Sequence, residues 1–289
     1  MARKFISILT LLLLFNTSVT LAQRPSLRVM SYNILEGMKL DTTTGKTHFA
    51  EWVKQMDLDI LALQEVTNFT QASLEKLAEQ YGHRYAILLI EGEKFPVAIT
   101  SKYPILNVQK VSDNMDRGFI TATINGYNIV SVHLTPFDYR KRAQEIDLLL
   151  AHIHAQPAKQ NWIVMGDFNT LSPIDSAAYS DGRMVANYQA YEKKYAPILK
   201  LADGKIDYSV IRKVHTAGFV DALKKQHPGF VKTVHPKRFE PKTGTDVPSR
   251  IDFIFISKDL VKKIGTVRVQ VDEFTDNYSD HYPVLFELK

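Results

Sequence analysis

A series of short apolar segments constrains the fold of this 289-residue chain more than any other sequence feature. The segments are rich in Val, Ile and Leu and are separated by turn-forming residues, as is typical of β-strands. Several are apolar on both faces, which is expected of strands that are covered on both sides. Asn125-Gly126 joins two of them and predicts a tight β-hairpin. The predicted strands are residues 27–35, 58–66, 85–90, 96–101, 118–124, 127–134, 161–168, 250–257, 265–271 and 284–288.

Helical patterns occur between these predicted strands. Apolar residues recur at helical spacing from Ile146 to Ile153, which predicts a helix over residues 138–155. Two further helices are predicted at residues 46–56 and 70–81. Strands in two groups with helices between them predict a layered α/β domain rather than a pure β-sandwich.

The N-terminal residues differ in character from the rest of the chain. Arg3 and Lys4 precede a short apolar run, and small residues follow up to Ala22. This arrangement predicts a signal peptide over residues 1–22 and an exported chain, either periplasmic or secreted. A membrane anchor is the alternative, but the apolar run is shorter than the ~20 residues that a span needs. We therefore expect no membrane span after cleavage, and a single domain over residues 23–289.

The composition limits the classes of partner. The chain has no cysteine, so disulfides and a lipid anchor on an N-terminal cysteine are excluded. Loss of Arg3 and Lys4 would lower the formal charge from +5 to +3, because 34 basic residues then face 31 acidic ones. A protein that binds a nucleic-acid duplex usually carries a stronger basic excess or a basic stripe. A nucleic-acid partner is therefore possible but not favoured, and we expect a monomer.

Acid, amide or imidazole side chains stand at the ends of six predicted strands. An isolated acid in an apolar strand, such as Asp252, is costly to bury without a partner. A loop cap or a satisfied core histidine explains any one of these residues, but their recurrence favours a common site. The residues are Asn33, Glu65, His133, Asp167, Asn169, Asp252, Asp280 and His281.

The chemistry of these side chains is coherent. Carboxylates without thiols favour a hard divalent cation, with Mg²⁺ expected and Mn²⁺ or Ca²⁺ possible. Two histidines beside several carboxylates can orient a water molecule and stabilise charge on a phosphoryl oxygen. The set therefore predicts metal-assisted hydrolysis of a phosphoester.

The short sequences that carry these residues resemble the ordered motifs of the endonuclease/exonuclease/phosphatase superfamily. They are SYNIL (31–35), LQEV (63–66), SVHL (131–134), GDFN (166–169), RIDFIF (250–255) and SDHYPV (279–284). The superfamily includes deoxyribonuclease I, exonuclease III-type enzymes, neutral sphingomyelinases and inositol-polyphosphate phosphatases. The resemblance implies a deoxyribonuclease I-like fold, a four-layer sandwich of two mixed β-sheets flanked by helices. It also implies a metal-dependent hydrolase in which a water molecule attacks the phosphorus in line with the leaving group.

The resemblance further implies a metal side and a phosphate side of the site. Glu65 would bind the metal, Asn33 would contact metal-bound water or phosphate, and Asp280 would lie on the same side. His133 would contact the phosphate, as in the nuclease and sphingomyelinase branches. Arg117, in MDRGFI, matches the phosphate-facing arginine of the superfamily.

The remaining roles concern the attacking water and the phosphoryl oxygens. By resemblance, Asp167 orients or deprotonates the water and Asn169 holds the phosphate. His281 pairs with Asp252 and donates to the phosphate oxygens.

The substrate is left open between several classes. The modest charge and a tyrosine-rich stretch over residues 176–207, which looks inserted, slightly favour a small molecule or a lipid head group. A secreted DNA or RNA nuclease fits the export signal equally well. A non-catalytic binding module on the same fold would be expected to have lost at least one motif, and none is broken.

Overall fold

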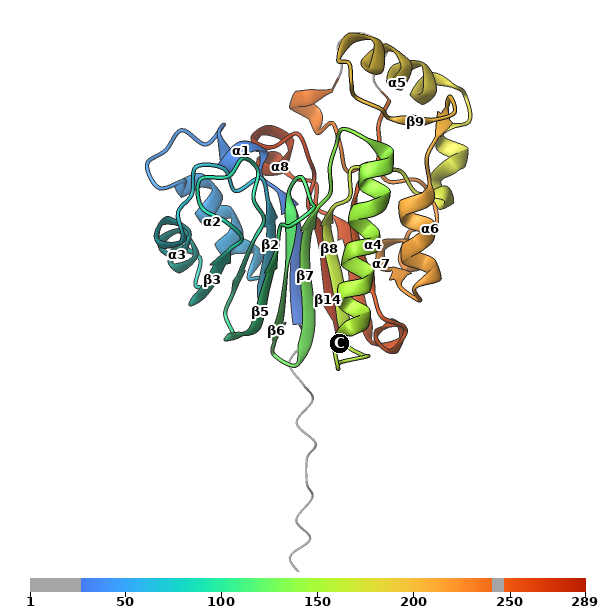
Figure 1. Ribbon diagram of the computed structural model, residues 1–289. Coiled ribbons are helices and arrows are strands. Elements are labelled where there is room, and N and C mark those ends of the chain that lie inside the picture. The colour runs from blue at the N-terminus through green and yellow to red at the C-terminus, as the bar shows by residue number, and fades with distance from the viewer. Residues whose placement is uncertain (1–26, 241–246) are drawn as a thin grey trace, which may run out of the picture.

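Two six-stranded β-sheets form the centre of the molecule (Figure 1). The computed structural model describes residues 27–240 and 247–289. The predicted signal peptide, residues 1–22, lies outside the described residues. The C-terminus lies at the lower end of the sandwich in Figure 1.

Both sheets are mixed, as the resemblance implies. The first has the order β13-β14-β1-β2-β4-β3 and the second β11-β12-β8-β7-β6-β5. The strands of the first are β13 (Ile264–Val269), β14 (Val284–Leu288), β1 (Leu27–Asn33), β2 (Ile60–Gln64), β4 (Ala98–Ser101) and β3 (Tyr85–Leu88). The strands of the second are β11 (Val220–Asp221), β12 (Asp252–Ile256), β8 (Trp162–Asp167), β7 (Tyr127–His133), β6 (Gly118–Ile124) and β5 (Ile105–Val111).

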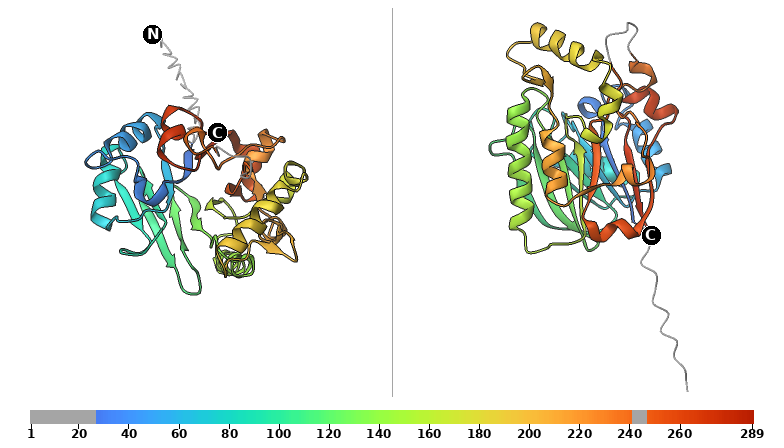
Figure 2. Two further views of the ribbon diagram at one scale, coloured as in Figure 1. Left: turned by 90° about the horizontal axis from the view of Figure 1, so that it is seen from above. Right: turned by 90° about the vertical axis from the view of Figure 1, so that its right-hand side faces the viewer.

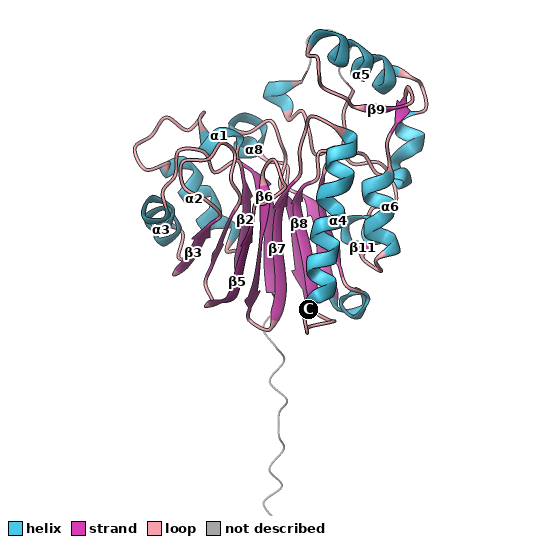
Figure 3. Ribbon diagram, in the orientation of Figure 1, coloured by secondary structure: helices cyan, strands magenta, loops and turns pink. Residues whose placement is uncertain are grey.

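Strand direction brings six strand ends to one edge of the sandwich. β1 runs parallel to β2 and antiparallel to β14. β7 runs parallel to β8, and β12 runs antiparallel to β8. The ends of β1, β2, β7 and β8 therefore lie at the same edge as the starts of β12 and β14, uppermost in Figure 3.

Helices cover the outer face of each sheet, which gives four layers (Figure 2). α2 (Thr47–Met56) and α3 (Gln71–Gln80) pack on the first sheet, and α4 (Tyr139–Ala155) and α6 (Ser209–Thr216) on the second. A third apolar cluster fills the space between the sheets. No helix in the described residues is long and apolar enough to span a bilayer. The shorter helices are α1 (Leu35–Met38), α5 (Arg183–Lys194), α7 (Ala222–Gln226), α8 (Glu273–Tyr278), η1 (Pro173–Tyr179), η2 (Lys237–Phe239) and η3 (Lys258–Lys263).

Most of the predicted elements are confirmed with boundaries within a few residues. The Asn125-Gly126 hairpin joins β6 and β7, with positive φ angles of 49° and 79° at its two central residues. β5 was not predicted, because it is an edge strand whose side chains are mostly exposed and which lacks an apolar run. The stretch over residues 176–207 is not a plain loop, since it contains α5 and the two-stranded ribbon of β9 (Leu201–Ala202) and β10 (Lys205–Ile206).

A buried arginine ties η1, which leads into this inserted stretch, to the second sheet. Arg250, two residues before β12, is fully buried. Its Nε donates to Asp175 Oδ2 at 2.7 Å and its NH1 to Asp221 Oδ2 at 2.8 Å. Lys224 Nζ lies 2.5 Å from Asp175 Oδ1, so two cations and two carboxylates are mutually neutralised. Pairing of this kind is what makes buried charge tolerable.

A buried histidine next to the first sheet makes stability depend on pH. His83 bonds Leu58 O at 2.8 Å and Thr100 Oγ1 at 2.8 Å. Burial lowers the pKa of His83 from 6.5 to about 4. The unfolded chain therefore binds this proton more tightly, and stability is lost as the pH falls from about 6.5 toward 4. Between pH 7 and pH 5 we expect His83 to remove about 2 kcal/mol from the free energy of unfolding.

Urea denaturation of the wild-type protein and His83→Gln at pH 7 and pH 5 measures this contribution. The loss between the two pH values should be smaller in His83→Gln than in the wild type. The exposed His154 offers a matched control, because His154→Gln should keep the wild-type loss. Equal losses in His83→Gln and the wild type would contradict the assignment.

Candidate active site

The alternation of side chains along the strands brings the predicted site residues together. On β8, Ile163 and Met165 face the core between the sheets, so Asp167 at the end of the strand faces the same space. The same alternation places Asn33 on β1, His133 on β7 and Asp252 on β12 at the inner faces of their sheets. The apolar space between the sheets therefore ends in a polar cluster at one edge.

Strand register makes three of these residues direct neighbours. His133 is paired with Asp167, and Asp167 with Asp252. Gly166 is required for this approach, because a Cβ on it would lie 1.8 Å from Val132 O, and its φ is +151°. We infer that the glycine of GDFN lets β8 approach β7 at the point where Asp167 meets His133.

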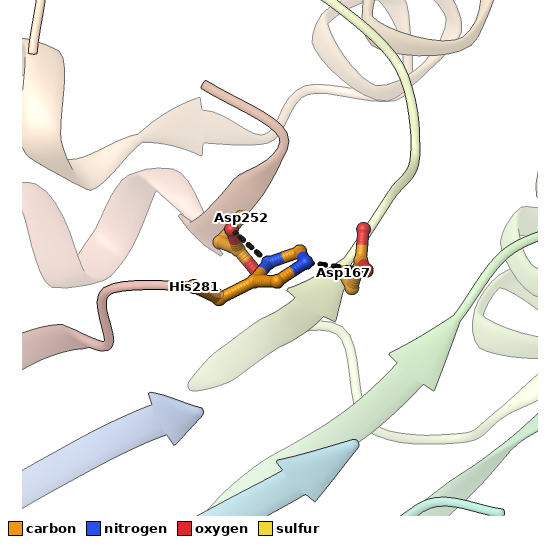
Figure 4. A group of neighbouring side chains, drawn as sticks. All are labelled: Asp167, Asp252 and His281. Carbon is orange, nitrogen blue, oxygen red and sulfur yellow. Dashed lines mark hydrogen bonds and ion pairs between the residues drawn. The ribbon is translucent and has the colours of Figure 1, made fainter. Parts of the chain in front are cut away.

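Asp252 and His281 form a buried pair (Figure 4). His281 Nδ1 lies 2.9 Å from Asp252 Oδ2 and 3.1 Å from Oδ1. Burial alone would lower the pKa of His281, but Asp252, with Asp280 and Asp167 behind it, raises that pKa well above its usual value. The ring is therefore held as an imidazolium whose Nε2 is turned toward Asp167, 3.9 Å from Oδ2.

Asp167 lies between this pair and His133. Its Oδ1 accepts the backbone N–H of Asn169 at 2.8 Å, and its Oδ2 accepts Asn33 Nδ2 at 3.1 Å. Burial raises the pKa of Asp167, the charge of Asp252 adds to that rise, and His281 opposes it. A carboxylate with a raised pKa is a stronger base, which suits proton abstraction from water.

His133 has the opposite protonation preference from His281. Its Nε2 lies 3.5 Å from Asp167 Oδ2, and its Nδ1 has no hydrogen-bond partner in the described part of the chain. Burial lowers the pKa of His133 to about 4, so the ring is neutral at pH 7. The site therefore contains one neutral and one charged imidazole on either side of one carboxylate.

Asn33 links Asp167 to Glu65. Asn33 Nδ2 lies 3.3 Å from Glu65 Oε1 as well as within hydrogen-bonding distance of Asp167. Glu65 Oε2 accepts the backbone N–H of Glu36 at 3.0 Å. Glu65 also adopts a φ of +61°, which strains a residue with a long side chain and is characteristic of functional positions. A network of hydrogen bonds therefore runs from the end of β2 to the end of β8.

The other predicted residues lie around this cluster. Asn169 Nδ2 donates to Leu134 O at 2.9 Å, one residue after His133. The Arg117 guanidinium stacks on the Phe95 ring at 3.9 Å from its centroid. Burial lowers the pKa of Arg117, while the charges of Glu65, Asp116 and Asp167 act in the opposite direction. The guanidinium is therefore close enough to these carboxylates to interact with them. Asp280 is half-buried and close enough to raise the pKa of His281.

Comparison with known proteins agrees with this geometry. The model of the Endonuclease/Exonuclease/phosphatase family matches residues 30–281. The chain belongs to this family. Enzymes of the family hydrolyse phosphoester bonds and depend on a divalent metal ion.

Three solved structures illustrate the shared fold. An AP endonuclease from Archaeoglobus fulgidus has 19% identity and a TM-score of 0.67 over 91% of this chain and 99% of its own. A 3′ phosphatase from Neisseria bound to a product DNA hairpin has 20% identity and a TM-score of 0.66 over the same shares. A 3′-5′ exonuclease from Neisseria meningitidis has 18% identity and a TM-score of 0.65, over 91% of this chain and 100% of its own. No curated protein sequence matches the chain.

The donor set fits the divalent metal of the family. Asp167, Asp252 and His281 offer ligand atoms that all lie within 4.8 Å of one another. His281 is already bonded to Asp252, and its raised pKa favours the protonated ring, which does not bind metals. The hard oxygens of Asn33 and Glu65 are therefore the better ligands, and the metal role of Glu65, Asn33 and Asp280 stays a prediction.

Several residues of the site were not predicted from the sequence. Thr233 Oγ1 accepts the backbone N–H groups of Ile251 and Asp252 at 3.1 and 3.2 Å. Ser279 Oγ donates to Asn33 O at 2.7 Å and so joins β1 to the turn before His281. Ser279 belongs to the SDHYPV motif, so its place in the site could have been predicted. Thr233 lies in no recognisable motif, so nothing in the sequence indicated its place there.

Proposed function

We propose that the chain is an exported phosphoesterase that hydrolyses a small-molecule or lipid head-group phosphoester. The observation that carries the proposal is the convergence of a basic carboxylate, an imidazolium–carboxylate pair and a strained glutamate at one sheet edge. Mg²⁺ is the proposed metal, with Mn²⁺ or Ca²⁺ as alternatives. The mature protein is proposed to begin after Ala22 and to act as a monomer, which N-terminal sequencing and light scattering would check.

Different side chains serve different steps of the in-line attack of water on phosphorus. Asp167 accepts a proton from the attacking water, since its pKa is raised and Asn169 and Asn33 fix its orientation. His281, held charged by Asp252, donates to a phosphoryl oxygen as charge develops there. These groups are positioned before the substrate arrives, so little reorganisation is needed during the reaction.

Other residues bind the phosphate and the metal. Arg117, Asn169 and neutral His133 surround the position of the phosphoryl group. Glu65, Asn33 and Asp280 would hold the divalent ion. When bound, that ion stabilises negative charge on the phosphoryl oxygens.

A secreted nuclease is the second candidate. The similar solved structures include nucleases and a phosphatase bound to DNA, although their low identity to this chain supports only the shared fold. The formal charge of +5 on the whole chain, or +3 without Arg3 and Lys4, is small for a protein that neutralises many phosphates. We therefore favour the smaller substrate.

A substrate panel separates the two candidates. The panel contains bis-p-nitrophenyl phosphate, inositol phosphates, phosphatidylinositol, sphingomyelin, plasmid DNA and RNA, each with Mg²⁺ and with chelator. We expect hydrolysis of a small phosphoester or a lipid head group, abolition by chelator and recovery on addition of Mg²⁺ or Mn²⁺. In Glu65→Gln, the metal concentration needed to restore activity should rise about tenfold or more, because a carboxylate that would bind the ion has been replaced by a neutral amide.

Two results would overturn the assignment. Cleavage of DNA or RNA at rates far above the other substrates would make the chain a nuclease. Full activity in the presence of chelator, with the metal removed beforehand, would contradict a metal-dependent site.

A further inference from the structure

An arginine beside the active site is buried with no ion pair to any described residue. Arg142, on α4, is 3% exposed. Its NH1 donates to Thr135 O at 2.7 Å, and its Nε has no hydrogen-bond partner among the described residues. Burial lowers its pKa, and the carboxylates of Asp207, Glu145 and Asp167 act on it only at longer range. Arg250, the other deeply buried arginine described above, is neutralised by two aspartates, so Arg142 is the exception.

A lysine from the inserted stretch lies close enough to Arg142 for the two charges to interact. Lys200 Nζ sits 5.2 Å from the centroid of the Tyr191 ring and 5.7 Å from that of Tyr188. Burial, together with the charge of Arg142, lowers the pKa of Lys200 to about 8. No ion pair to Lys200 Nζ occurs within the described ranges. Glu192 Oε1 accepts the backbone N–H of Lys200 at 2.5 Å, but its charge acts on the Lys200 ammonium only at longer range. Neither cation therefore has an ion pair among the described residues.

The backbone holds both cations close to the catalytic edge. Leu199 N donates to Phe137 O at 2.9 Å, and Tyr139 N to Leu199 O at 2.9 Å, which fixes Lys200 against the start of α4. Both Arg142 and Lys200 interact electrostatically with Asp167. Thr135, which anchors Arg142, follows the Leu134 carbonyl that binds Asn169. The cations thus flank the phosphate side of the site rather than a remote surface.

We propose that Arg142 and Lys200 bind a second phosphate group of the substrate while the first is hydrolysed at Asp167. This inference rests on the proposed function and specifies its substrate as a molecule with two phosphate groups. Burying two unpaired cations is unfavourable, and a phosphate oxygen would satisfy Arg142 Nε and the Lys200 ammonium together.

The surroundings favour a small molecule over nucleic acid as the source of this phosphate. A nucleic-acid groove presents exposed basic residues along the backbone, because each successive phosphate must be met. Here one cation is deeply buried and the other is partly enclosed by the rings of Tyr188 and Tyr191. Such a site fits one compact anionic group.

Competitive inhibition of bis-p-nitrophenyl phosphate hydrolysis tests the site with a matched pair of probes. Fructose 1,6-bisphosphate and fructose 6-phosphate differ by one phosphate. In the wild type, the inhibition constant of the bisphosphate should be about tenfold lower than that of the monophosphate, or lower still, as expected of an added charge-assisted hydrogen bond. In Lys200→Met the ratio of the two inhibition constants should fall close to one. Arg142→Gln, which keeps an N–H for Thr135 O, should lower the ratio as well.

Lys194→Met is the matched control. Lys194 belongs to the same insert and also lies over a tyrosine ring, 4.8 Å from the centroid of Tyr195, but it is exposed. Its replacement should leave the ratio unchanged. A wild-type ratio near one, or an unchanged ratio in Lys200→Met, would overturn the second-phosphate site.

The design distinguishes failure of this site from failure of the proposed function. Calorimetric titration with the same two probes yields their affinities without turnover, so it tests the site even if no phosphoester is hydrolysed. A duplex oligonucleotide carrying a 3′-phosphate forms a further arm. If Lys200→Met weakens binding of the oligonucleotide but not of fructose 1,6-bisphosphate, the second phosphate belongs to nucleic acid and the small-molecule assignment is wrong.

Discussion

Asp167→Asn is expected to lower kcat at least about a hundredfold while leaving the fold intact. The amide keeps the shape of the side chain but cannot accept the proton of the attacking water. Its nitrogen would also face Asn33 Nδ2, which now donates to Asp167 Oδ2. Steady-state kinetics on the best substrate of the panel, at saturating Mg²⁺, measure the loss.

The same loss is expected in His281→Ala and Glu65→Gln, since each removes a different part of the same site. Circular dichroism should show melting close to that of the wild type, which separates lost chemistry from lost folding. Asp113→Asn is the matched control, because Asp113 is exposed and lies outside the cluster. Near-normal hydrolysis in all three variants would refute the assignment of the active site.

Arg250→Met is expected to destabilise the protein by about 3–5 kcal/mol, the usual effect of removing one partner from a buried ionic network. Asp175 and Asp221 would remain buried, with Lys224 as the one cation in contact with Asp175. Urea denaturation followed by tryptophan fluorescence measures the change in the free energy of unfolding. Activity should fall only where the fold is lost, because Arg250 does not contact the catalytic cluster in the described residues.

An exposed ion pair provides the comparison for Arg250. Arg183 Nε lies 2.6 Å from Asp181 Oδ2, but both side chains are exposed and water screens the pair. Arg183→Met should therefore leave the unfolding midpoint unchanged. If Arg250→Met also left the unfolding midpoint unchanged, the ionic network around Asp175 would contribute nothing to the attachment of η1.

The strands and the polar residues that gather at one edge were largely predictable because each left a local signal. Apolar runs such as residues 161–168 indicate strands wherever they stand, and the resemblance of GDFN and SDHYPV to known motifs indicated the family. β5 was missed because its exposed side chains break the apolar pattern. Asp252 was predicted inside its strand but is its first residue, a difference of the size expected for strand boundaries.

The unequal protonation of the two histidines was not predictable from the sequence. His133 and His281 are both buried at the same edge, yet the pKa of His133 falls to about 4 while that of His281 rises. Of the two rings, Asp252 contacts only that of His281, at Nδ1. The resemblance implied this pair but not the burial that lowers the pKa of His133.

The sequence by itself determined most of the strands and three of the helices, the alternation that turns polar residues inward, and the family. Those properties depend on neighbours along the chain and on short motifs. Only the tertiary structure decided which charges are paired. Arg250 is paired with two aspartates, whereas Arg142 and Lys200 interact electrostatically with each other and have no ion pair among the described residues. Electrostatic energy depends on distance in space and on burial, and both are fixed only when the layers pack.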